Sequence, residues 1–212
     1  TKVVLLFVTA AGLIPTLVGC TGIVISAGST IASAAVEERG ISGAASDLAI
    51  ATAITALWIK HDPSLVTDFD TAISEGRVLL TGTVATQKRR LEAVRLAWRA
   101  PGVKTIINEI DVRKSDGIGG YARDGWITAQ LVSRLSFDRG VNYINYNLET
   151  VNQIVYLLGI AQNQTEMDRV VTHARQVRYV RRVVSHIRLK NDPRRKLKRK
   201  TLSKPGQRVR AY

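Results

Sequence analysis

The chain carries one pattern of apolar and polar positions twice, over residues 47–113 and 124–190. A shift of 77 residues aligns the two stretches without a gap and places Gly82 on Gly159. A repeat of this length indicates two copies of one small domain. We therefore expect each copy to contain the same elements in the same order.

Each copy is expected to open with a helix. Asp47 and Asp124 are predicted as its N-caps, because a side-chain oxygen there can accept a backbone N–H of the first turn. Apolar residues then recur every three or four positions, the spacing of a buried helix face. These residues are Ile50, Ile54 and Trp58 in the first copy and Ile127, Leu131 and Leu135 in the second.

Two short strands follow in each copy, where apolar and polar residues alternate. Gly76 and Asn152 are the predicted residues of the tight turns between them. The strands are expected at residues 69–73 and 78–84 in the first copy and at 146–150 and 154–160 in the second.

A second helix and a last strand complete each copy. Thr86 and Asn163 are its predicted N-caps, and Asn163 with Glu166 has the spacing of a capping box. Pro101 and Gly102 stop the helix in the first copy. The predicted buried helix face comprises Ala93, Ala97 and Ala100 or Val170, Ala174 and Val177, and the last strand comprises Val103, Ile106, Ile110 and Val112 or Val180, Val183, Ile187 and Leu189.

The order helix, strand, strand, helix, strand predicts an α+β fold. Two helices can cover one face of a three-stranded mixed sheet and bury its apolar side. We therefore expect two tandem αββαβ domains, at residues 47–113 and 124–190. Residues 114–123, which include "GIGG", are predicted to be a flexible linker between them.

The first residues have the pattern of a secretory signal. Lys2 precedes an apolar run, and small residues lead up to Cys20, the single cysteine of the chain. One cysteine excludes a disulfide scaffold. We expect a signal peptide at residues 1–19 and a linker at 20–46. The alternative is an uncleaved anchor helix, because apolar residues resume after Cys20.

Charge is concentrated at the other end of the chain. The formal net charge is +14, and residues 191–212 carry +8 of it, as nine Lys and Arg less one Asp. This segment has almost no apolar residues, which predicts a disordered basic tail. Such a tail attracts polyanions, whether anionic lipid, lipopolysaccharide or nucleic acid.

Trp126 is the strongest candidate for a binding residue. It aligns with Ala49 and lies off the apolar stripe of its helix, so the shared core does not need it. A tryptophan of this kind suits a membrane interface, and Arg123, Arg134 and Arg139 could meet phosphate groups beside it. The alternative is that Trp126 packs between the two domains and the arginines form a solvated face.

A second basic group comprises Arg175, Arg178, Arg181 and Arg182, around the end of the second helix of the second copy. It is either a lipid or polyanion site or a set of solvated charges, which at a helix C-terminus also complement the helix dipole. The three histidines have no spacing typical of a zinc site, and no nucleophile has an evident base. We expect no catalytic residue, no metal and no cofactor.

Several segments resemble the BON-domain family. "GRVLLTGTV", then a helix, then "PGVKTIINEIDV" is similar to a BON domain, and "DGWITAQLVSRL" resembles the start of the second domain in dual-BON outer-membrane lipoproteins of the DolP type. Leu17 to Cys20 resemble a lipobox. The second copy departs from the family pattern, with Tyr179 and Ser185 where the first has Gly102 and Asn108.

The resemblance implies a non-enzymatic lipoprotein, acylated at Cys20 and held on the periplasmic face of the outer membrane. It implies binding to anionic phospholipid through the first helix of the second domain, support of envelope integrity and possible outer-membrane assembly proteins as partners. Nucleic acid is not expected. The alternatives are an RNA- or polyanion-binding protein that uses the basic tail, and an envelope adaptor that binds a protein partner.

Overall fold

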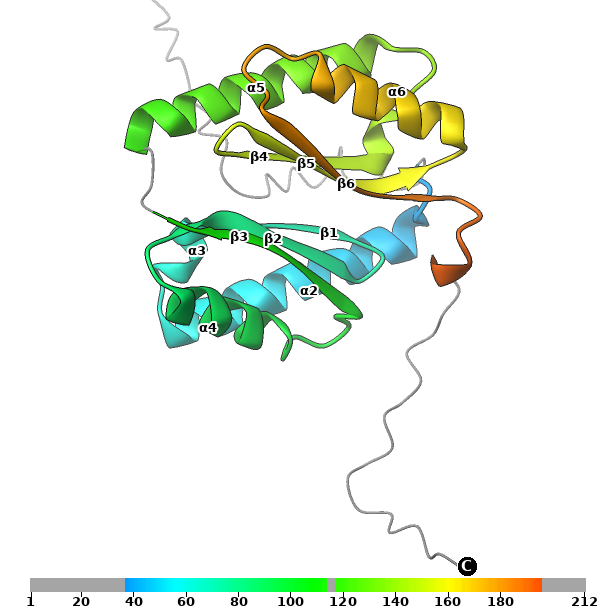
Figure 1. Cartoon of the computed structure of the whole chain (residues 1–212). Coiled ribbons are helices and arrows are strands. Elements are labelled where there is room, and N and C mark those ends of the chain that lie inside the picture. The colour runs from blue at the N-terminus through cyan, green and yellow to red at the C-terminus, as the bar shows by residue number, and fades with distance from the viewer. Residues whose placement is uncertain (1–36, 114–116, 196–212) are drawn as a thin grey trace, which may run out of the picture.

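The computed structural model describes residues 37–113 and 117–195 as two αββαβ domains (Figure 1). This confirms the predicted α+β class. The first domain contains α2 Gly40–His61, α3 Leu65–Asp68, β1 Phe69–Ser74, β2 Arg77–Val84, α4 Gln87–Ala97 and β3 Thr105–Val112. The second contains α5 Gly117–Phe137, η1 Tyr143–Asn145, β4 Tyr146–Val151, β5 Ile154–Ala161, α6 Gln164–Arg175 and β6 Arg182–Leu189.

Each domain has a three-stranded mixed sheet whose central strand is paired on both sides. β2 pairs with β1 antiparallel and with β3 parallel, and β5 pairs in the same way with β4 and β6. The hairpin turns have positive φ at both central residues, Glu75 and Gly76 in one and Asn152 and Gln153 in the other. Two such residues give the twist that a two-residue hairpin needs, so the predicted turns are confirmed.

The two helices that open the domains start earlier than predicted. α2 begins at Gly40 and α5 at Gly117, so Asp47 and Asp124 lie inside helices and are not N-caps. Each aspartate instead accepts two backbone N–H groups of its domain's hairpin turn, at 2.7–2.8 Å. A carboxylate has two oxygens, so it can tie both turn residues to the helix. Both helices thus begin inside the segments expected as linkers, 20–46 and 114–123.

The caps and core faces of the second helices agree with the sequence. Thr86 accepts from the backbone of Arg89, and Asn163 accepts from that of Glu166. The Glu166 side chain does not close the capping box, because its oxygens accept from the backbone of Asn142 and Gln162. All six small or branched residues predicted for the buried faces of α4 and α6 are buried, including Ala100 and Val177 beyond the helix ends.

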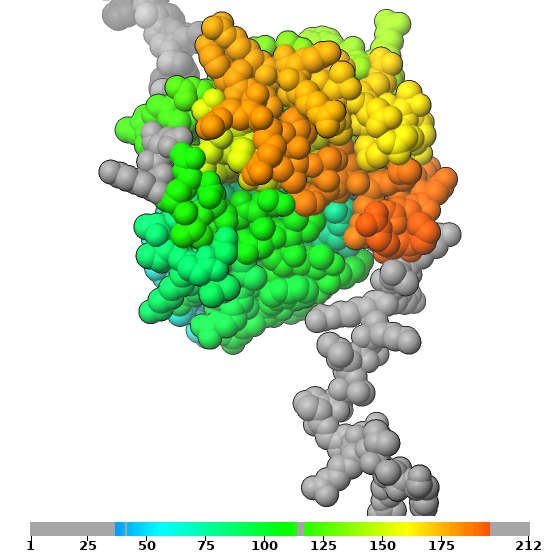
Figure 2. All heavy atoms as spheres, in the orientation of Figure 1, coloured from blue at the N-terminus to red at the C-terminus, as the bar shows by residue number. Residues whose placement is uncertain are grey.

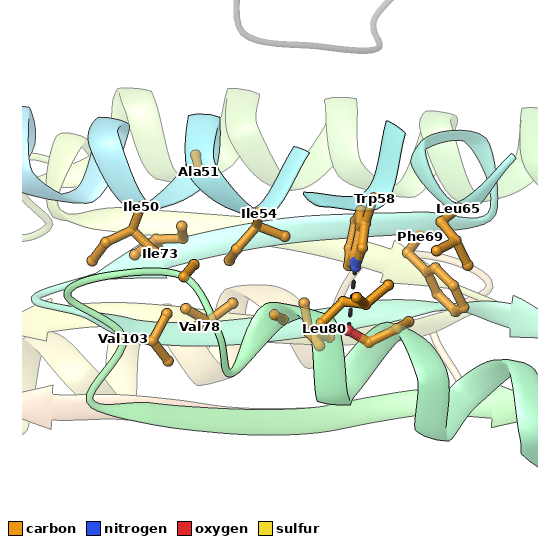
Figure 3. Close-up of a cluster of buried hydrophobic side chains, with 14 of the residues drawn as sticks. Ile50, Ala51, Ile54, Trp58, Leu65, Phe69, Ile73, Val78, Leu80 and Val103 are labelled. Atoms are coloured by element: carbon orange, nitrogen blue, oxygen red, sulfur yellow. Dashed lines mark hydrogen bonds between the residues drawn. The ribbon is translucent and has the colours of Figure 1, made fainter. Parts of the chain in front are cut away.

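The core of the first domain lies between α2, α4 and the inner face of the sheet (Figure 3). Trp58 is almost fully buried, and its indole Nε1 donates to the carbonyl oxygen of Ala93 at 3.2 Å. Within α2, the segment Ser42–His61 is long and apolar enough for a membrane span. Its buried residues pack on the sheet, however, which identifies α2 as a core helix of this domain.

The outer faces of the two sheets pack on one another, with the helices outside (Figure 1). Ala72 and Leu79 from the first sheet meet Tyr156 and Leu158 from the second in one buried cluster. Leu79 and Tyr156 occupy equivalent positions of the repeat, since their numbers differ by 77. The two copies therefore form one compact unit of four layers: helices, sheet, sheet and helices.

Five residues of the expected basic tail are ordered. The chain turns after β6, and η2 Pro193–Arg195 lies against the first domain. Arg195 donates to both carboxylate oxygens of Glu75, at 2.8 and 3.0 Å. Residues 196–212, and the predicted signal, lipobox and Cys20, lie outside the described residues.

Candidate membrane-binding surface

The outward side of α5 carries large apolar side chains. Ile127, Leu131 and Leu135 point into the core and are fully buried. Trp126 is 42% exposed and Phe137 is 86% exposed. An α-helix has 3.6 residues per turn, so residues 126 and 137 are about three turns apart on one stripe. The second domain thus presents aromatic rings to solvent along its outermost helix.

Trp126 does not lie between the domains. Its ring contacts that of Tyr179 edge to face, with 5.6 Å between the centroids, and Tyr179 is itself 46% exposed. The guanidinium of Arg178 lies 4.6 Å from the centroid of the Tyr179 ring. Both contacts are made inside the second domain. A cation on an aromatic face and an edge-to-face pair are each stabilising arrangements.

Tyr179 joins the two surfaces that the sequence suggested separately. Trp126 belongs to the first predicted group and Arg178 to the second, and Tyr179 contacts both. Sequence reasoning noted Tyr179 only as a departure from Gly102. The signal in the sequence was a bulky residue at the position of Gly102. The structure shows why it matters: Tyr179 has φ +71° where Gly102 has φ +90°, in backbone that favours glycine.

Arg123 and Arg134 lie on the α5 side that also carries Trp126. Their positions, 123 and 134, are again about three turns apart, next to the stripe of Trp126 and Phe137. Both side chains are exposed. Among the described residues, neither has a carboxylate within ion-pair distance. Their charges therefore remain available to an external anion.

Arg139 is less closely placed. It follows the end of α5, on the far side of Phe137 from Trp126, and is exposed. Residues 126 and 137 are already about 16 Å apart along α5, and Arg139 lies two residues beyond the helix end. The structure thus brings Arg139 to the end of the surface and not to the side of Trp126.

The second predicted group is exposed as a whole. Arg175 ends α6, Arg178 and Arg181 lie in the following turn, and Arg182 opens β6. No ion pair is formed by these four within the described part of the chain. We use "aromatic-arginine surface" for the exposed set Arg123, Trp126, Arg134, Phe137, Arg178 and Tyr179. It can offer rings to an apolar layer and cations to phosphate groups.

Comparison with known proteins places both copies in one family. The BON domain matches residues 46–114 and 123–191, close to the two repeats found in the sequence.

The described residues contain no group of three histidine, cysteine, aspartate or glutamate side chains that could hold a metal ion.

Three relatives align with about two thirds of the chain. A protein of Anaplasma centrale, "Uncharacterized protein in gshII 5'region", is 39% identical over 146 residues, which is 68% of this chain and 95% of that one. "Osmotically-inducible protein Y" of Escherichia coli (strain K12) is 30% identical over 146 residues, 68% and 73% of the two chains. "Outer membrane lipoprotein DolP" of Haemophilus influenzae is 28% identical over 148 residues, 69% and 77%.

Proposed function

The chain belongs to the BON-domain family, and from this premise we propose that it is a non-enzymatic envelope protein that binds anionic phospholipid membranes through its second domain. The contact is made by the aromatic-arginine surface. The observation that carries the proposal is the contact of Trp126 with Tyr179 and of Tyr179 with Arg178, all on the exterior.

The aromatic part suits the boundary between headgroups and acyl chains. Tryptophan and tyrosine are enriched there because each has an apolar ring and a polar tip that stays hydrated. Phe137 adds a fully apolar ring on the same stripe as Trp126. Burying such rings in the interface gains the free energy of removing apolar area from water.

The arginines favour lipids with negatively charged headgroups. Each Lys or Arg near an anionic surface contributes about 1 kcal/mol. Arg123 and Arg134 flank the aromatic stripe, and Arg178 stacks on Tyr179 at its edge. A guanidinium can donate two parallel hydrogen bonds to a phosphate. We therefore expect preference for anionic over zwitterionic vesicles.

The proposal includes an anchor at the other end of the chain. Leu17 to Cys20 resemble a lipobox, and the relative from Haemophilus influenzae is named as an outer membrane lipoprotein. Acylation of Cys20 would hold the protein on the periplasmic face of the outer membrane, because two or more acyl chains anchor a protein stably. Support of envelope integrity and contact with outer-membrane assembly proteins follow as proposed roles.

The test uses tryptophan fluorescence of the full chain. Vesicles carry brominated phosphatidylglycerol or brominated phosphatidylcholine, since bromine quenches rings that enter the acyl region. The chain has three tryptophans: Trp58 is buried, while Trp98 and Trp126 are 43% and 42% exposed. Neither the basic tail nor the predicted signal contains tryptophan. The readout therefore reports on the folded domains alone.

We expect quenching by the anionic vesicles, retained in Trp98→Phe and largely lost in Trp126→Phe. Arg123→Gln with Arg134→Gln should weaken vesicle binding by about fivefold per arginine, the equivalent of about 1 kcal/mol each. The control is Arg95→Gln with Arg99→Gln on the first domain. Quenching that survives Trp126→Phe, or binding without any quenching, would assign the contact to another part of the chain.

A further inference from the structure

A basic pocket lies where the two domains and η2 meet. Its volume is about 260 Å³. In Figure 2 the orange end of the described chain lies at the right, across the boundary between the upper and lower domains. The lining residues are Glu75, Arg77, Lys104, Thr105, Arg188, Arg194 and Arg195, from the first hairpin, the approach to β3, β6 and η2.

The carboxylates near the pocket are already occupied by two of its arginines. Arg195 makes a bidentate pair with Glu75, at 2.8 and 3.0 Å. Arg194 pairs with Asp192, with 2.6 Å between Nη2 and Oδ2. Among the described residues, Arg77, Lys104 and Arg188 form no ion pair of their own. Glu75 and Asp192 attract Arg77 and Arg188 only at longer range.

Arg77 is the unusual member of this group. It is only 6% exposed. Its Nη2 donates to the carbonyl oxygen of His186 at 2.6 Å, but its Nε is buried without an acceptor. Burial, with Arg188 close by, lowers the pKa of Arg77 to about 10. A buried cation with an unmet donor and a like charge beside it is costly unless an anion joins it.

The repeat shows that the fold of a single domain does not need a cation at the positions of Arg77 and Arg188. Ile154 occupies the position equivalent to Arg77, and Asp111 the position equivalent to Arg188. Both domains form the same sheet and the same hairpin, although the residues at these two positions differ. Arg77 and Arg188 are therefore a property of one end of the domain boundary, and the fold of a single domain does not require them.

We propose that this pocket binds a phosphate group, with Arg77, Arg188 and Lys104 as the ligands. Guanidinium groups donate in a planar fork that matches phosphate oxygens, and an ammonium adds a point charge. Thr105 lines the same pocket and offers a hydroxyl. The pocket lies at the boundary between the sheets, whereas the aromatic-arginine surface is formed by α5 and the turn after α6. The two binding functions are therefore separable.

The test observes the guanidinium Nε–H signals of Arg77 and Arg188 by NMR of the full chain. Inorganic phosphate is titrated against sodium chloride of equal ionic strength. We expect saturable shifts of both signals with phosphate and not with chloride. Lys104→Gln and Arg188→Gln should each weaken this binding by about tenfold. Lys88→Gln is the matched control, because Lys88 is an exposed lysine on α4 of the first domain and lines neither the pocket nor the aromatic-arginine surface.

Two sources of phosphate are distinguished by a second arm with phosphatidic acid vesicles. If a lipid headgroup is the ligand, Lys104→Gln weakens vesicle binding as well. If a soluble phosphate is the ligand, Lys104→Gln leaves vesicle binding unchanged while the NMR shifts are lost. Equal shifts with chloride, or equal losses in Lys104→Gln and Lys88→Gln, would overturn the proposal. If anionic vesicles fail to quench Trp126 in the parent while the phosphate shifts persist, only the membrane proposal is overturned.

Discussion

His186 and Glu109 form a hydrogen bond across the boundary between the two domains, with 2.9 Å between Nε2 and Oε1. They are the same position of the repeat, because their numbers differ by 77. Leu79 and Tyr156, and Ile107 and Val184, repeat this relationship in the apolar cluster beneath them. An approximate two-fold axis therefore relates the two domains and passes between His186 and Glu109.

The pair should contribute modestly to stability. Both side chains are about one quarter exposed, and partly exposed pairs contribute about 0.2–1 kcal/mol. A double-mutant cycle with His186→Ala and Glu109→Ala, measured by urea unfolding, should give a coupling of this size. Strictly additive effects would show that the two groups do not interact across the boundary.

Asp47 and Asp124 should stabilise the hairpins and not the helix ends. Asp47→Asn keeps the shape of the side chain but replaces one carboxylate oxygen with an NH₂ group. One backbone N–H of the turn then has no acceptor, so we expect the free energy of unfolding to fall by about 1.5–3 kcal/mol. The loss should be smaller for Asp124→Asn, which is less buried. Asp168→Asn, on the exposed side of α6, is the control and should change stability by less than about 0.5 kcal/mol.

Gly82 and Gly159 allow the first strand of each hairpin to approach the second. A Cβ on Gly82 would lie 2.3 Å from the carbonyl oxygen of Asp68, and one on Gly159 would lie 2.2 Å from that of Asn145. Either alanine substitution should lower the free energy of unfolding by at least about 2 kcal/mol. Gly125→Ala, in open space on α5, should instead raise it by about 0.5–1 kcal/mol. Thermal melts of the three variants test this contrast.

Glu149 should make stability depend on pH. Burial, with Asp70 nearby, raises the pKa of Glu149 to about 7. In the unfolded chain the pKa of this carboxyl is near 4.5. Between about pH 4.5 and pH 7 the folded chain therefore keeps a proton on Glu149 that the unfolded chain has released. The contribution of Glu149 is therefore fully present below about pH 4.5 and is lost as pH rises to 7.

Glu149→Gln should remove this dependence. At pH 8 the variant should be more stable than the parent by about 1–3 kcal/mol, because no charge is buried. Urea unfolding at pH 5 and pH 8 measures the difference. The same change of stability with pH in the parent and the variant would contradict the assignment to Glu149.

Truncation of Trp58 should cost far more stability than truncation of Trp126. Trp58→Ala removes a buried ring and its hydrogen bond to Ala93, which should cost at least about 3 kcal/mol. Trp126→Ala removes an exposed ring and should cost less than about 1 kcal/mol. A large fall in melting temperature for Trp126→Ala would identify it as part of the core.

Local patterns were sufficient for most of the fold. Alternation and helical spacing located all six strands to within about two residues, and the residue pairs 77 apart identified the two copies. The starts of α2 and α5 were not predicted, because aspartate is a common N-cap residue and Asp47 and Asp124 were therefore assigned as caps. Their carboxylates bind turns 28 residues later, and that contact depends on tertiary structure.

The candidate surfaces were predictable only in part. Trp126 could be separated from the core because Ala49 fills its position in the first copy. Its neighbour Tyr179 is 53 residues away, and local spacing cannot show that contact. The basic pocket was not predicted at all, because Arg77 and Arg188 belong to different domains and meet only when the sheets pack.

The approximate two-fold axis has a consequence for assembly. Repeats that stack head to tail leave a free face at each end, so further copies can be added. Two copies that meet about a two-fold axis each use the same face, which makes the contact isologous and closed. Within residues 37–113 and 117–195, each sheet has one face covered by helices and the other by its partner sheet, so neither sheet offers a face to a third domain. The chain thus holds in one polypeptide a pair that separate subunits would form only at sufficient concentration.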